Sequence, residues 1–135
     1  MKKLSLIHLA LIALTQTAWA QDVNYIECSW TGSNTGGHVV QTTRTLADGS
    51  YTTLANNYDE YPSLSGGWYV VASNCSYFSR IVINGNVNIV VMDGTELYCV
   101  QGIQIKDGYT LTIYAQSDGD GMNTIMPNAG ATPCR

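Results

Sequence analysis

The chain has 135 residues, of which 45% are hydrophobic, and a formal net charge of −4. This length fits one domain. The six basic residues are outnumbered by ten acidic ones, which argues against nucleic acid and anionic membrane surfaces as partners.

Residues 1–20 have the pattern of a secretory signal peptide. Lys2 and Lys3 precede an apolar stretch, and Ala18-Trp19-Ala20 supplies the small residues that a signal peptidase accepts. The apolar stretch is shorter than the roughly 20 residues that a membrane-spanning helix needs. The sequence therefore predicts bacterial Sec-type export, a mature chain that starts near Gln21, and a secreted, periplasmic or cell-surface location with no membrane span after cleavage.

The mature chain has the composition of strands and turns. Gly, Thr, Ser, Asn, Val, Ile and Tyr dominate, and no stretch keeps a helical apolar period. Residues 39–46 and 51–54 flank Asp48-Gly49, a dipeptide that tolerates the positive φ of a hairpin turn. We expect an all-β protein in which residues 21–66 form an N-terminal β-hairpin and cap region.

From Trp68 onward, short alternating strands repeat. An offset of 22 residues superimposes seven apolar positions that we expect to face inward, and a period of this size is typical of one coil of a parallel β-helix. We predict about two to three coils over residues 67–126 and a loop-like tail at 127–135. A small β-sandwich or meander is the alternative. The superimposed pairs are Cys75 with Leu97, Tyr77 with Cys99, Ile81 with Ile103, Ile83 with Ile105, Val87 with Tyr109, Ile89 with Leu111, and Val91 with Ile113.

Residues 66–126 resemble a segment of secreted, adhesin-like repeat proteins of host-associated bacteria. The similarity lies in Gly66-Gly67-Trp68-Tyr69-Val70-Val71, in the run from Gly85 to Gly94, and in Leu111 to Ser117. The resemblance implies a right-handed parallel β-helix that continues for further coils, and it transfers no catalytic residue. Two expectations follow: the chain is a truncated segment of a larger surface protein, or it self-associates through the open end of the helix.

The 22-residue offset also places the cysteines. Cys75 and Cys99 become diagonal neighbours about 8 Å apart, beyond the usual limit of about 7 Å between the Cα atoms of a disulfide. Both are predicted to be core thiols, unless a slip of two residues allows the bridge. Cys28 and Cys134 are the freer candidates for a disulfide.

An outward-facing surface is the predicted ligand site. Alternation directs Tyr98 and Tyr114 outward, and tyrosine suits sugars because it joins apolar area to a polar tip. The alternative is that residues 22–65 cover this surface. The predicted carbohydrate-binding residues are Asn88, Val90, Met92, Tyr98, Thr110, Thr112 and Tyr114.

Signals for catalysis or metal binding are weak. His38 is the one histidine of the predicted mature chain and follows two glycines, as a solvated loop histidine does. Asp118, Asp120 and Asn123 only partly match a calcium loop, because Met122 occupies one ligand position. No cofactor is predicted. The expected function is a non-catalytic exported module that binds carbohydrate or another surface component; the alternatives are a structural or assembly piece and, third, a carbohydrate-active enzyme.

Overall fold

The computed structural model describes residues 21–117 and the strand at 124–127, and this part of the chain is all-β. The predictions for the signal peptide, for Asp118, Asp120 and Asn123, and for Cys134 lie outside the described residues. The strands are β1 (Val23–Thr31), β2 (His38–Leu46), β3 (Thr52–Thr53), β4 (Ser63–Val71), β5 (Cys75–Tyr77), β6 (Ile81–Val91), β7 (Glu96–Cys99), β8 (Ile103–Ile105), β9 (Leu111–Ala115) and β10 (Thr124–Pro127).

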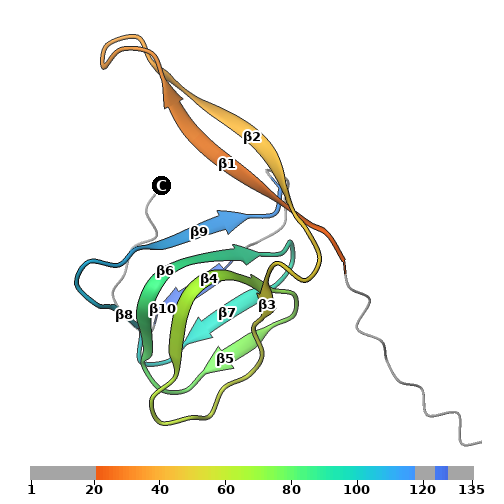
Figure 1. Cartoon of the computed structure of the whole chain (residues 1–135), viewed down its shortest axis with the longest axis vertical. Helices are drawn as coiled ribbons and strands as arrows, with labels where there is room; N and C mark the ends of the chain where they lie inside the picture. Colours follow the sequence, from red (N-terminus) through yellow and green to blue (C-terminus); the bar gives the residue numbers. More distant parts are fainter. Residues whose placement is uncertain (1–20, 118–123, 128–135) are drawn as a thin grey trace, which may run out of the picture.

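The strands form one hairpin and two parallel sheets (Figure 1). β1 and β2 pair with each other in antiparallel fashion. A second sheet has the order β3-β4-β6-β8, with β9 also paired to β6, and a third has the order β10-β7-β5. All pairs in these two sheets are parallel, which an antiparallel meander would not give.

The predicted hairpin around Asp48-Gly49 is wrong. The antiparallel partner of β2 is β1, with Val23 opposite Leu46 and Thr31 opposite His38. A turn does form at 47–50, where Gly49 has a φ of 75°, but it redirects the chain into β3. β3 then pairs in parallel with β4, so parallel pairing begins at Thr52, before the predicted boundary at residue 67.

The first half of the predicted 22-residue register is confirmed. Cys75 pairs with Leu97, and Tyr77 pairs with Cys99. The same offset continues in the next sheet, where Ile81 lies beside Ile103 and Ile83 beside Ile105, as predicted.

The second half of the predicted register is wrong by two residues. Ile89 pairs with Ile113 rather than Leu111, an offset of 24. The turn after β8 accommodates the extra length: Gly108 has a φ of 83°, and the N–H of Tyr109 donates to the carbonyl of Lys106. The other two pairs predicted here are wrong for the same reason, because Val87 pairs with Leu111 and Val91 with Ala115.

The core lies between the two parallel sheets. β6 alternates as the sequence predicts, so that Ile81, Ile83, Val87, Ile89 and Val91 are all buried. Branched side chains pack well on a pleated sheet, which is why this run forms the central strand. They pack with residues of the facing sheet, namely Cys75, Tyr77, Leu97 and Cys99.

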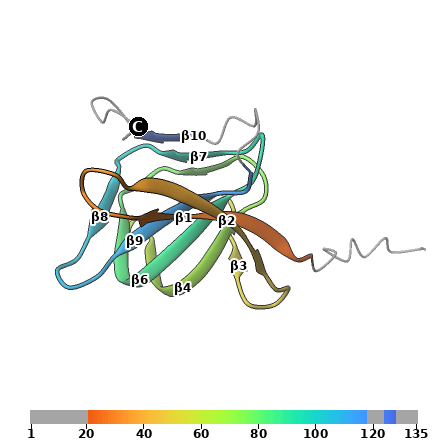
Figure 2. The same ribbon diagram turned by 90° about the horizontal axis from the view of Figure 1, so that it is seen from above.

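The hairpin contacts the rest of the protein mainly through its base. Val23 and Leu46 are buried there against Val70 and Val90. Farther along, Trp30 and Val39 are more than half exposed. Figure 1 shows the hairpin rising away from β9 towards its tip, and in the view from above in Figure 2 the hairpin lies over β9.

Candidate functional site

The base of the hairpin covers part of the predicted carbohydrate-binding face. Val90 is fully buried, because the base of the hairpin packs on it, so the prediction that it binds a ligand is wrong. The corrected register places Thr112 beside Asn88 and Tyr114 beside Val90. The alternative that residues 22–65 cover this face is therefore the better description.

The remaining predicted residues do not form one surface. Tyr98 is exposed, but it lies on β7, in the other parallel sheet. Thr110 and Thr112 are exposed, whereas Asn88 and Met92 are partly buried. Thr110 is hydrogen-bonded to Asn86: its N–H and its hydroxyl both donate to the Asn86 Oδ1 atom at 3.2 Å.

Three aromatic rings fix the hairpin to the sheet. The ring centroid of Tyr25 lies 4.9 Å from that of Trp68 and 4.8 Å from that of Tyr114. Trp68 and Tyr114 stack at 5.3 Å with an interplanar angle of 27°. Burial, with smaller contributions from Tyr25 and Glu27, raises the pKa of the Tyr114 phenol. Tyr114 is therefore a packing residue of the hairpin base.

Replacing Tyr25 by alanine should loosen the hairpin. The change removes two ring contacts, each of about 0.5–1.5 kcal/mol beyond the area buried. In residues 21–135 with Trp30→Phe, where Trp68 is the one remaining tryptophan, we expect its fluorescence to shift to longer wavelength. Tyr58→Ala is the control, because Tyr58 lies far from this cluster in the sequence and is largely exposed. An unchanged Trp68 spectrum in Tyr25→Ala would contradict the role of Tyr25.

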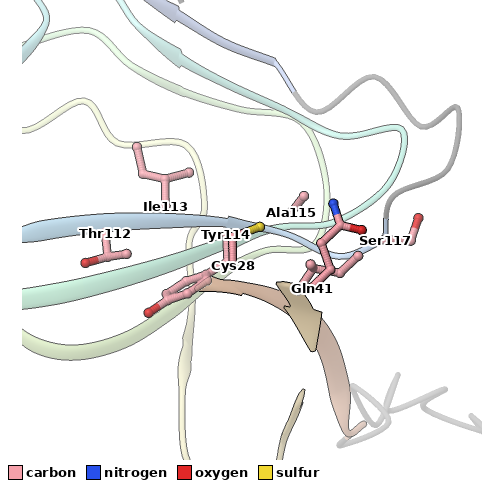
Figure 3. Close-up of a pocket in the computed structure, with 8 residues that line it drawn as sticks. Cys28, Gln41, Thr112, Ile113, Tyr114, Ala115 and Ser117 are labelled. Carbon is pink, nitrogen blue, oxygen red and sulfur yellow. The ribbon is translucent and has the colours of Figure 1, made fainter. Parts of the chain in front are cut away.

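A cleft separates the middle of the hairpin from β9 (Figure 3). Its volume is about 300 Å³ and its lining is mostly apolar. Among the described residues that line it, none is an aspartate, glutamate, lysine, arginine or histidine. The walls are Ile26, Cys28 and Gln41 of the hairpin and Thr112, Ile113, Tyr114, Ala115 and Ser117 from β9 and the residues after it.

The strands β8 and β9 carry apolar side chains that are exposed in the structure. Ile83 and Ile89 on β6 are fully buried. Their register partners on the next strands are not, since Ile105 is 47% exposed and Ile113 is 45% exposed. Positions that are buried in the core on β6 are therefore about half exposed on the neighbouring strands β8 and β9. We call Ile105, Tyr109 and Ile113 the open end.

The cysteines that the structure describes are free thiols. Cys28 is exposed and lines the cleft, whereas Cys75 and Cys99 are buried. Burial, and secondarily Cys75, raises the pKa of Cys99 from its ordinary 9.0 to about 11. Burial also raises the pKa of Cys75. Cys75 and Cys99 are thus core thiols, as predicted, and Cys28 forms no disulfide in the structure.

The raised pKa of Cys99 predicts a loss of stability at alkaline pH. Between about pH 9 and pH 11 the unfolded chain releases this proton and the folded chain keeps it, so the free energy of unfolding falls as pH rises. Between pH 8 and pH 10.5, measured by urea titration, the contribution of Cys99 alone should be about 2 kcal/mol, and the raised pKa values of Cys75 and Tyr77 add to the fall in the same direction. In Cys99→Ala the pH dependence should shrink; an undiminished dependence would contradict this assignment.

Catalytic and metal-binding groups do not converge in the described residues. Within residues 21–117 and 124–127, no group of three or more His, Cys, Asp or Glu residues is placed to hold a metal ion. His38 is exposed at the start of β2. This part of the chain also contains no helix with the length and hydropathy to cross a membrane.

Comparison of the chain with models of protein families, with curated proteins and with solved structures gave no match. The functional proposals therefore rest on the cleft, the open end and the exposed aromatic residues of this chain.

Proposed function

We propose that the chain is an exported, non-catalytic assembly module, built as a short right-handed parallel β-helix that joins other protein chains, copies of itself included. The repeated inward positions on β4, β6 and β9 support the β-helix, as do the parallel pairs of β5 with β7 and of β7 with β10. Export rests on the signal-peptide pattern of residues 1–20.

The observation that carries the assembly proposal is the open end. Ile113 and Ile105 occupy positions that are fully buried one strand earlier, at Ile89 and Ile83. Burying apolar surface is favourable by about 25 cal/mol per Å², so the open end favours association with a chain that covers it. Exposed sheet edges are usually protected by charge or proline, and β9 (LTIYA) has neither.

The first test is the molar mass of residues 21–135 by light scattering over a range of concentrations. We expect the mass to rise above that of a monomer, and Ile113→Lys to reverse the rise by placing a charge at the open end. A chain that stays monomeric at every concentration would contradict self-assembly. For export, N-terminal sequencing of the chain produced in a bacterial host should start at or near Gln21; an intact Met1 would contradict it.

Carbohydrate binding is a second candidate, at a different place from the predicted face. Tyr58 is 74% exposed and stacks on Phe78, with centroids 4.9 Å apart and an interplanar angle of 13°. Tyr98 is exposed in the same sheet as β5, which Phe78 follows. Flat, exposed rings of this kind can stack against sugars. A glycan array with Tyr58→Ala and Tyr98→Ala tests it: binding that neither variant weakens would exclude these rings.

A further inference from the structure

The edge of β9 that faces away from β6 carries backbone groups that no strand among residues 21–117 and 124–127 pairs with. The N–H of Val87 donates to the carbonyl of Thr110 at 2.9 Å, which fixes the pattern of the parallel pair. Alternate residues of a parallel strand direct their N–H and C=O groups to opposite sides. Leu111, Ile113 and Ala115 therefore present theirs at the outer edge, where no strand of the described part of the chain pairs with them.

The cleft lies where the next strand would be added. A neighbouring strand would run about 4.8 Å from β9. On its outer side this position is bounded by the hairpin, through Ile26 and Cys28, so that a strand placed there contacts both walls of the cleft. In the view from above, the hairpin lies over β9 (Figure 2), which favours a single added strand over a whole second stack of strands.

The residue pattern of a strand added to β9 follows from the strands that it would extend. Paired positions on β4, β6 and β9 form columns, such as Tyr69, Ile89 and Ile113. A second column ends in Ala115 above Val91. A strand that extends these columns needs apolar residues at alternate positions. The described residues that line the cleft include no charged side chain, so they offer no partner to a charged residue between those positions.

We infer that the cleft between the hairpin and β9 binds an extended, uncharged segment of another polypeptide, which adds to β9 as a strand with apolar residues at alternate positions. Main-chain hydrogen bonds to Leu111, Ile113 and Ala115 supply the pairing, and the side chain of Ile113 and the hairpin wall of the cleft receive the side chains of the added strand. This inference rests on the proposed assembly function and specifies its contact.

The probe is a peptide with the sequence of residues 86–92, which has the required alternation, carrying two lysines outside each end for solubility. Added to isotope-labelled residues 21–135, it should shift the amide resonances of Leu111, Ile113 and Ala115 in a saturable manner. The absence of saturable shifts at these amides would overturn the inference.

Two N-methylated forms of the peptide test the backbone pairing. One carries methyl groups on the amides of its odd positions and the other on those of its even positions. A strand turns only one of these sets toward β9, so only one form should lose binding, by at least tenfold. Equal binding by both forms, or loss in both, would overturn strand addition.

Protein variants test the place of binding. Ile113→Lys should weaken peptide binding by at least tenfold. Ile105→Lys is the matched control, since Ile105 is similarly exposed but does not line the cleft, and its affinity should stay within about twofold. Equal loss in both variants would point to a general apolar contact and contradict the inference.

The molar mass and the peptide titration together distinguish strand addition at the cleft from the proposed assembly function. A chain that self-associates but does not bind the peptide refutes strand addition and leaves assembly standing. A monomeric chain that binds the peptide supports strand addition and identifies the partner as a different protein. A monomeric chain that does not bind it contradicts both.

Discussion

Replacing Gly85 by alanine should destabilise the protein by about 3 kcal/mol, because the new methyl group would collide with backbone. A Cβ atom at Gly85 would lie only 2.2 Å from the Gly66 nitrogen and 2.7 Å from its Cα atom. Backbone held in a parallel ladder cannot move aside as a flexible side chain can. The strands β4 and β6 change register at this point, between Ser65 and Gly67, so the close approach belongs to a bulge.

Gly66→Ala is the matched control for Gly85→Ala. Its Cβ atom would meet the Asn86 carbonyl at 3.3 Å, so a shift of a few tenths of an ångström relieves the contact. We expect a cost of about 1 kcal/mol for this variant. Urea denaturation followed by circular dichroism measures both. Equal costs for the two substitutions would show that the Gly66–Gly85 contact does not limit the packing of β4 on β6.

Ile89→Ala should be the second strongly destabilising change, with a loss of about 4 kcal/mol. Ile89 is fully buried at the centre of β6, and truncation there removes transfer energy and leaves a cavity. Ile113 is the same residue type in the paired position of β9, but 45% of it is exposed. At low protein concentration, Ile113→Ala should cost about 1 kcal/mol.

The comparison of these two isoleucines tests whether the end of the strand stack is open. Denaturation at low protein concentration measures the free energy of unfolding of the monomer, in which no second chain covers Ile113. If Ile113→Ala cost as much as Ile89→Ala there, Ile113 would be a core residue and the open end would not exist. A small cost that grows with protein concentration would support association at this face.

The alternation along β6 and the short offset between β5 and β7 could be predicted from the sequence. Both depend on local patterns, in which inward residues repeat every second position and turn residues mark the ends. From Val87 onward the predicted register is short by two residues, because the 22-residue offset does not hold across the turn at Gly108. Two further residues in this turn leave the apolar alternation of the next strand unchanged, so the sequence pattern does not reveal them.

The hairpin could not be placed from the sequence. Asp48-Gly49 is a stronger hairpin signal than the loop at 32–37. The sequence therefore predicts that β2 pairs with the strand after Asp48-Gly49, whereas in the structure it pairs with β1. The contact of Tyr25 with Trp68 and Tyr114 joins segments far apart in the chain, and no local pattern encodes it. The burial of Val90 beneath the hairpin base has the same origin, since alternation shows which side chains leave the core but not what covers them.

The cleft and the open end were only partly predictable. Self-association at the end of the repeats is an expectation from the sequence, because a strand stack that stops leaves one edge unpaired. The cleft depends on the hairpin position and therefore needed the structure. Cys28, a disulfide candidate from the sequence, is a free thiol in this cleft.

Amide hydrogen exchange at β9 tests the central claim most directly. Thr112 and Tyr114 direct their N–H groups toward β6, whereas Leu111, Ile113 and Ala115 direct theirs outward. At low protein concentration we expect slow exchange at the first two residues and fast exchange at the other three. Uniformly slow exchange at all five amides would contradict the account, because it would show that the outer edge of β9 is already covered in the isolated chain.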